Sequence, residues 1–221
     1  MSKEAERAEL HKTIWRIAND LRGSVDGWDF KSYVLGMLFY RFISENLTAY
    51  LNEQERLAGN PDFDYARLGA EEAGYGRAET VNEKGFFIFP ADLFVNVRSR
   101  ARHDANLNET LSNIFADIEG SATGSDSEND IKGLFDDLDV NSSKLGPTVA
   151  KRNEKLVKLL DAIGDLPLTN EGGFSANSID LFGDAYEYLM QMYASTAGKS
   201  GGEFYTPQEV SELLARITVV G

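Results

Sequence analysis

One stretch near the end of the chain combines residue types that could bind a charged ligand. It reads Gly198-Lys199-Ser200-Gly201-Gly202-Glu203-Phe204-Tyr205-Thr206-Pro207. Its glycines permit positive φ angles and a close approach of the backbone to another group. Thr206 suits the N-cap of a following helix, and Pro207 suits its first position. Phe204 and Tyr205 should therefore lie at a helix N-terminus, where free N–H groups favour an anionic or carboxylate-bearing ligand.

Two helices should hold this stretch in place. The preceding helix is predicted from an apolar pattern that includes Ile179, Leu181, Phe182, Tyr186, Leu189, Met190 and Tyr193. The second should begin near Pro207 and run almost to the last residue. A plain connector between two helices, with its aromatic side chains packed inward, would have the same pattern.

The rest of the chain is predicted to form a helical bundle. The segment from Tyr33 to Ile43 is apolar on nearly every side, which is typical of a buried central helix. Gly36 within it would allow a neighbouring helix to approach closely. Helices are expected at about residues 4–22, from Asp26 or Asp29 to about 57, 90–102, from Asn106 or Asn108 to 118, 131–138, and from Pro147 or Thr148 to 163.

Little β-structure is expected. Residues 58–84 are polar and should form a long loop or a pair of irregular turns, which could include a short helix near 66–73. The run Gly85-Phe86-Phe87-Ile88-Phe89 could form a strand that pairs with Thr80-Val81 in a small hairpin. The expected fold class is therefore mainly α, a multi-helix bundle with at most a small β-hairpin.

Composition limits the function classes. The chain has 221 residues, of which 42% are apolar, so it can bury a core. It has no cysteine and two histidines, so no metal site is expected. It contains no apolar run near the roughly 20 residues that span a bilayer, and no signal-peptide core, so we expect a cytoplasmic protein without membrane contact.

The charge is unfavourable for independent DNA binding. Thirty-six acidic and 22 basic side chains give a formal charge of −14, which should repel phosphates. Two basic groups are exceptions: Arg98, Arg100, Arg102 and His103; and Lys151, Arg152, Lys155 and Lys158. The first group could compensate a helix dipole and the second could be a solvated helix face. Alternatively, the first group could contact a phosphate or a partner.

Residues 201–207 resemble the Gly-Glu-Phe-Tyr-Thr-Pro segment of the modification subunit of type I restriction-modification systems, an adenine-N6 DNA methyltransferase. Residues 14–23, 33–44 and 184–190 are similar to further parts of the same family. These blocks occur in the family's order and span nearly the whole chain. The sequence is thus identified as similar to the helical N-terminal domain of that subunit.

The resemblance implies S-adenosyl-L-methionine-dependent methylation of adenine N6 in DNA by the intact subunit. Residues 1–197 would form the helical domain, and residues 198–221 would lead into a Rossmann-like catalytic domain that is absent from this sequence. The implied cofactor-binding residues are Glu203, Phe204, Tyr205, Thr206, Pro207 and Gln208. The implied partners are DNA, the specificity subunit, the restriction subunit and a second modification subunit. The helical domain would help to enclose DNA and dock the specificity subunit.

No residue is assigned a catalytic role. In the family, the Asp-Pro-x-x-Gly-x-Gly loop and the Asn-Pro-Pro-aromatic motif follow the cofactor segment, and neither follows Thr206 here. Asn60-Pro61-Asp62-Phe63 is similar to the second motif, but it has Asp at the third position and precedes the cofactor segment. It is better explained as a turn. We therefore interpret the chain as an N-terminal fragment or truncated product and expect it to be inactive alone.

Two other functions remain open at this point. The chain could be a helical protein-interaction module whose aromatic loop binds a partner and has no cofactor role. It could also be a stand-alone DNA-binding domain, which the acidic composition disfavours. Cofactor binding and salt-dependent DNA binding would distinguish them.

Overall fold

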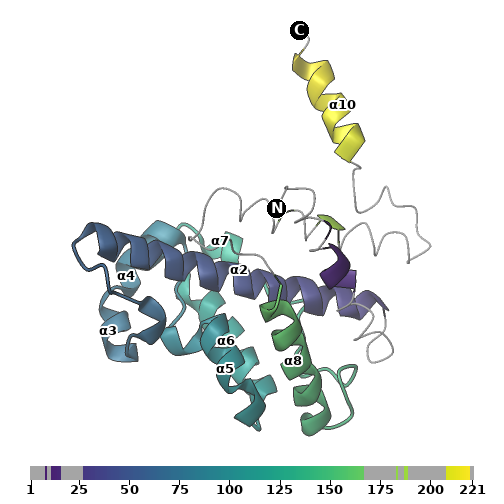
Figure 1. Ribbon diagram of the computed structural model, residues 1–221, viewed down its shortest axis with the longest axis horizontal. Coiled ribbons are helices and arrows are strands. Elements are labelled where there is room, and N and C mark those ends of the chain that lie inside the picture. Colours follow the sequence, from purple (N-terminus) through teal and green to yellow (C-terminus); the bar gives the residue numbers. More distant parts are fainter. Residues whose placement is uncertain are drawn as a thin grey trace.

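A computed structural model describes residues 8, 11–15, 27–166, 183, 187–188 and 208–219. All regular elements with assigned bounds in these ranges are helical, and they include three short 3-10 helices (Figure 1). The elements are α2 Gly27–Leu57, η1 Tyr65–Arg67, α3 Ala70–Tyr75, α4 Arg77–Lys84, η2 Pro90–Asp92, α5 Phe94–Arg100, η3 Ala101–His103, α6 Leu107–Ser121, α7 Glu128–Ile131, α8 Val149–Gly164 and α10 Gln208–Val219. The prediction of a mainly α fold is confirmed.

Helix α2 is the centre of the fold, as its apolar sequence predicts. It crosses the assembly of α3 to α8, with α5, α6 and α8 along one side (Figure 1). Met37, Leu38 and Leu47 have no exposed surface. Burying side chains of this size contributes about 1.5–3 kcal/mol each, so α2 should supply a large share of the folding free energy.

An aromatic cluster joins α2 to the helices beneath it. The Tyr40 ring meets Phe94 of α5 edge-on at 5.6 Å and Phe115 of α6 at 5.4 Å. Phe115 in turn stacks on Phe135 at 4.4 Å. The Tyr40 hydroxyl donates a hydrogen bond to the Asp92 carbonyl, and burial raises the pKa of this hydroxyl. Tyr40 therefore remains a neutral donor inside the core.

Gly36 provides the close approach predicted from the sequence, but its neighbour is not a helix. A Cβ atom at this position would lie 2.8 Å from Cδ2 of Leu138. Leu138 is buried and belongs to the irregular segment between α7 and α8. Because Gly36 has no side chain, this segment can pack directly on the backbone of α2.

Several predicted boundaries agree with the structure. Helix α2 ends at Leu57, and α8 is N-capped by Thr148, whose Oγ1 accepts a hydrogen bond from the Lys151 amide at 3.3 Å. Asn106 is the N-cap residue of α6, although its side chain makes no capping hydrogen bond. Residues 11–15 are helical, whereas the rest of the predicted first helix lies outside the described residues.

The predicted hairpin is wrong. Thr80 and Val81 lie in α4, and residues 86–89 form no strand. Gly85 ends α4 with a φ of 85°, and its amide donates to the Val81 carbonyl at 2.8 Å. The Phe87 amide donates to Ser121 Oγ at 2.8 Å, so a side chain of α6 takes the place of a strand partner. A glycine C-cap explains the helix end here.

Three other predicted segments also differ. Residues 58–84 are more helical than predicted, because they contain η1, α3 and α4; η1 and α3 overlap the short helix expected near 66–73. The helix predicted for 90–102 is interrupted at Leu93, which is extended, with η2 before it and α5 after it. The helix predicted for 131–138 is replaced by turns after α7, where Lys132 is extended and Gly133 has a φ of 77°. Among the described helices, none is both long and apolar enough to cross a membrane.

Candidate functional site

Most of the predicted cofactor segment lies outside the described residues. Glu203, Phe204, Tyr205, Thr206 and Pro207 belong to that part, and so does the N-cap role predicted for Thr206. Gln208 is described as the first residue of α10, without its side chain. A helix thus begins directly after Pro207 and runs to Val219, which confirms the helix predicted there. The roles of the six residues stay predictions.

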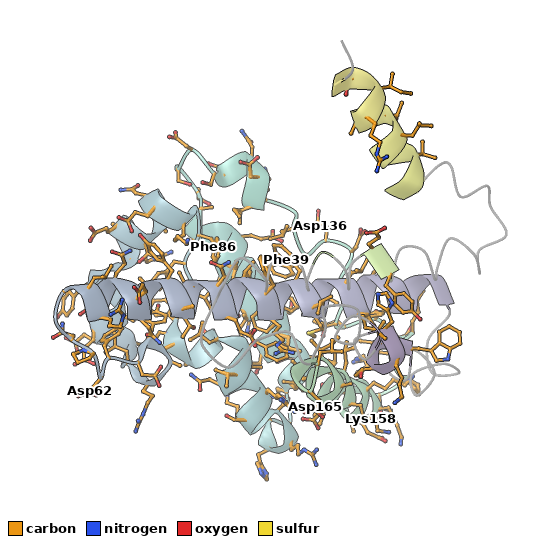
Figure 2. All side chains as sticks on the ribbon, turned by 45° about the horizontal axis from the view of Figure 1, so that its top comes forward. Phe39, Asp62, Phe86, Asp136, Lys158 and Asp165 are labelled. Carbon is orange, nitrogen blue, oxygen red and sulfur yellow. The ribbon has the colours of Figure 1, made fainter. Side chains whose placement is uncertain are left out.

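Helix α10 presents an apolar face that the described residues do not cover. Val210, Leu213, Leu214 and Ile217 are spaced three, one and three residues apart and share one side of the helix. Their exposed fractions are 44%, 57%, 55% and 63%. Figure 1 shows α10 (yellow) apart from α2 to α8, and Figure 2 shows its side chains without neighbours from those helices. A stripe of this kind is typical of a helix that packs on another surface.

A ring contact connects two distant parts of the chain. The His11 ring stacks on the Tyr188 ring with centroids 4.0 Å apart and planes at 8°. Tyr188 belongs to the helix predicted to precede the glycine-rich stretch, and the described residues 183, 187 and 188 of that helix are helical. The N-terminal residues therefore contact the element that leads toward residues 198–207.

The 33–44 block, one of those that carried the resemblance, has a structural role here. Arg41 is buried, and its Nη1 donates to the carbonyl oxygens of Ile163 at 2.6 Å and Leu166 at 2.8 Å. Its Nε also pairs with Glu45 at 2.6 Å. Ser44 Oγ accepts from the Phe94 amide at 3.2 Å. Polar groups of α2 thus add side-chain partners to the carbonyls at the C-terminus of α8 and to the first amide of α5.

The arginines at the end of α5 are held by carboxylates. Arg98 pairs with Asp165 and lies 3.5 Å from Asp161, and Arg102 pairs with Asp161 at 2.6 Å. Arg100 lies 3.5 Å from the Asp92 carboxylate. Asp161 is on α8 and Asp165 follows it, so the ion pairs of Arg98 and Arg102 join α5 and η3 to α8. The arrangement favours a structural role over the phosphate contact left open from the sequence.

The basic side of α8 also contains an internal counter-charge. Lys151 and Lys158 contact the two oxygens of Glu154 at 2.9 and 3.1 Å, and together they lower the pKa of its carboxyl to about 2. Arg152 donates from Nη1 to the Gly146 carbonyl at 3.2 Å. Two lysines of this face therefore share one carboxylate of the same helix, and Arg152 has a backbone carbonyl as a partner.

The sequence Asn60-Pro61-Asp62-Phe63 forms a turn, as predicted. The Phe63 amide donates to the Asn60 carbonyl at 3.2 Å, and the Asn60 side chain donates to Glu55 at 2.6 Å. Figure 2 shows Asp62 on the turn beyond the C-terminal end of α2. The Asn60 amide group is thus occupied as part of the turn, which agrees with the decision to assign it no catalytic role.

Comparison with known proteins gives two family matches that together cover most of the chain. Residues 10–163 match the family described as HsdM N-terminal domain. Residues 177–220 match the family described as N-6 DNA Methylase. The second match contains the predicted cofactor segment and all of α10.

Individual relatives agree with these matches. The chain is 51% identical over 221 residues to the type I restriction enzyme MpnII methylase subunit of Mycoplasma pneumoniae, covering 97% of this chain and 40% of the relative. It is 22% identical over 209 residues to the MjaIX methylase subunit of Methanocaldococcus jannaschii, covering 95% and 35%. The crystal structure of a type I restriction-modification methyltransferase subunit from Streptococcus thermophilus superposes with a TM-score of 0.73 at 29% identity, covering 97% and 44%. The chain thus spans less than half the length of each relative.

Proposed function

The chain belongs to the family of the HsdM N-terminal domain, and from this premise we propose that it works as the N-terminal part of a type I restriction-modification methylase subunit. Such a subunit would transfer a methyl group to adenine N6 in cytoplasmic DNA. Residues 1–197 would be the helical domain, and residues 198–221 would connect it to a methyltransferase domain of the kind present in the longer relatives.

The exposed apolar face of α10 is the observation that supports this proposal most directly. Burying the four apolar side chains of this face would lower the free energy, because apolar surface is unfavourable in water. We therefore expect the face to pack on a surface other than α2 to α8. The match to the N-6 DNA Methylase family over the same residues suggests the occupant, a methyltransferase domain. The helix start at Gln208 would then lie at the boundary between the two domains.

We assign the cofactor segment to residues 203–208. Glu203 would face the ammonium of S-adenosyl-L-methionine, and the helix start after Pro207 would face its carboxylate. Phe204 and Tyr205 would close the pocket against water. The described start of α10 directly after Pro207 fits this assignment, because the first amides of a helix have no internal partner. S-adenosyl-L-methionine, when bound, supplies the methyl group, and extruding the adenine from the duplex costs a few kcal/mol that the pocket must recover.

The described helices are unsuited to hold DNA unaided. The chain carries a formal charge of −14, and the arginines of α5 are engaged with Asp92, Asp161 and Asp165. We therefore propose that DNA is enclosed by the assembled complex rather than by this domain alone. The specificity subunit, the restriction subunit and a second methylase subunit are its proposed partners in that complex.

A chimaera tests the cofactor assignment. Residues 1–221 would replace the corresponding part of the Mycoplasma pneumoniae methylase subunit, to which they are 51% identical. We expect the chimaera to bind S-adenosyl-L-methionine in calorimetry, and the double variant Phe204→Ala with Tyr205→Ala to bind at least about tenfold more weakly, because removing two ring contacts costs more than about 1.4 kcal/mol.

The matched control removes two large side chains elsewhere. Leu57→Ala with Tyr75→Ala alters side chains that are already exposed, so cofactor affinity should not change. Equal affinity of the Phe204/Tyr205 variant and the parent chimaera would refute the cofactor role. That result would favour the alternative, a helical protein-interaction module whose aromatic loop binds a partner chain.

A further inference from the structure

A pocket of about 470 Å³ lies at the C-terminal end of α2, between α2, η1, α3 and α4. Its size is within the range of about 300–1,000 Å³ typical of ligand pockets. It lies within residues 50–87 and contains no residue of the proposed cofactor segment. Figure 1 shows α3 and α4 grouped at this end of α2.

Aromatic side chains form much of its wall. Of these lining residues, Tyr65 and Phe87 are buried, and Tyr50 and Phe63 are partly exposed. Tyr65 is fixed in place because its hydroxyl donates to the Ile88 carbonyl at 2.8 Å. The faces of aromatic rings carry partial negative charge, which attracts a cation placed over the ring.

All charged residues that line the pocket are acidic. They are Glu55, Glu72, Glu79 and Glu83. Glu83 accepts a hydrogen bond from the Tyr50 hydroxyl at 2.6 Å, and Glu55 accepts from Asn60. Glu72 accepts from the Gly69 amide at 3.4 Å, so three of the four carboxylates are oriented. None of the four takes part in an ion pair found among the described residues. Their charge therefore remains available to a ligand.

The protein itself already places a cation at the edge of this pocket. Lys84 Nζ lies 4.1 Å from the centre of the Tyr50 ring. Because Tyr50 also donates to Glu83, the Lys84 ammonium, the ring and the carboxylate form a connected group. A second cation, from a ligand, would bind in the same way, over an aromatic ring and next to a carboxylate.

Two exposed apolar side chains lie beside the pocket residues in the sequence. Leu57 precedes Ala58, Tyr75 precedes Gly76, and both Ala58 and Gly76 line the pocket. Their exposed fractions are 67% and 81%, the highest of the large apolar side chains among the described residues. Single exposed apolar residues are ordinary, but a pair beside an acidic aromatic pocket offers contact area to a protein chain.

We propose that this pocket docks an arginine side chain presented by a partner protein. A planar guanidinium can stack on an aromatic ring while it donates to carboxylates, which a compact ammonium does less well. Nucleic acid is disfavoured because its phosphates would meet four carboxylates. A small polyamine would match the charge but would leave Leu57 and Tyr75 uncovered. The inference does not depend on the methylase proposal, because it concerns residues 50–87 alone.

Amide chemical shifts of the 221-residue chain test the inference. The probe is acetyl-Gly-Arg-Gly-amide, and its partner probe carries citrulline, which has the same shape without the charge. We expect saturable shifts at Gly69, Gly76 and Thr80 with the arginine peptide and none with the citrulline peptide. Glu79→Gln with Glu83→Gln should weaken binding about fivefold, since each exposed ion pair contributes up to about 1 kcal/mol.

A charge-matched control uses Glu109→Gln with Asp137→Asn, two exposed residues outside the pocket. This control should bind the arginine peptide as the parent does. Three results would overturn the inference: no saturable shift, equal shifts with citrulline, or equal weakening by both double variants. Binding of spermidine without binding of the arginine peptide would also overturn it, in favour of a polyamine site.

Discussion

Arg41 Nη1 donates to the carbonyl oxygen of Ile163 across a distance of 2.6 Å, although 122 positions separate the two residues in the chain. Arg41 lies near the middle of α2, and Ile163 lies in the last turn of α8. The contact places a permanent positive charge at the negative end of the α8 dipole. It therefore stabilises the helix end and fixes how α8 packs on α2.

Loss of this contact should destabilise the fold. In Arg41→Met the apolar stem is kept, but the carbonyls of Ile163 and Leu166 lose a charged donor inside the protein. We expect the free energy of unfolding to fall by about 2–3 kcal/mol, measured by urea denaturation. Arg56→Met is the control on the same helix, because Arg56 is exposed and pairs with Glu53; its effect should stay within about 0.5 kcal/mol. Equal effects of the two variants would contradict the capping role.

Gly36 should not tolerate a side chain. In Gly36→Ala the new methyl group would lie 2.8 Å from Leu138 Cδ2 and 3.2 Å from Leu138 Cβ, so the Leu138 side chain must shift within the core. We expect a loss of about 1–3 kcal/mol in the free energy of unfolding. Gly74→Ala in α3 is the control, since nothing lies within 4 Å of its Cβ position. In a Leu138→Ala background the Gly36→Ala cost should shrink, and full additivity would argue against a clash between the two.

Asp92 should make stability depend on pH. Burial raises the pKa of its carboxyl above the ordinary 3.8, Arg100 lowers it and Asp117 raises it, with a net upward shift. Just above pH 3.8 the folded state therefore holds more protons than the unfolded state. Consequently, the free energy of unfolding attributable to Asp92 declines as pH rises through its folded pKa. Asp92→Asn should remove this decline in urea titrations between pH 4 and pH 7, and an unchanged difference between the two proteins across this range would contradict the assignment.

The apolar face of α10 should matter only when a second surface is present. Leu213→Ser with Leu214→Ser changes two residues that are more than half exposed, so the unfolding free energy of this chain should change by less than about 0.5 kcal/mol. In the chimaera described above, the same double substitution should reduce both the yield of folded protein and the affinity for S-adenosyl-L-methionine. A large loss of stability in the chain alone would show that the face is already covered.

Much of the architecture could be predicted from local patterns. The apolar run from Tyr33 to Ile43 predicted the buried hub, and Pro147 or Thr148 before an amphipathic stretch predicted the start of α8. The predictions fail where the local residue pattern favours one structure and a contact with a distant residue favours another. The aromatic run after Gly85 is typical of a strand, but the Phe87 amide is satisfied by Ser121, 34 residues away.

The candidate site was only partly within reach of sequence reasoning. The helix after Pro207 was predicted, while the six cofactor residues remain predictions. The pocket between α2, α3 and α4 was missed, because three of its four glutamates come from residues 58–84, which were interpreted as a polar loop. Four acidic residues within 29 positions were a possible signal, but nothing local places them around Tyr65 and Phe87.

The sequence by itself determined most of the helical segments. It also determined where the glycine-rich stretch lies and to which family the chain belongs. These properties depend on side-chain periodicity, capping residues and short motifs, all of which act over a few residues. The tertiary structure decided which charged side chains form ion pairs and hydrogen bonds, and with which partners. The sequence assigned no contact to Arg41 and left Arg98 between helix-dipole compensation and a phosphate or partner contact. Packing of α8 brings these two arginines to Ile163 and Asp165. Partners 67 to 122 positions away are chosen by helix packing, which no local pattern specifies.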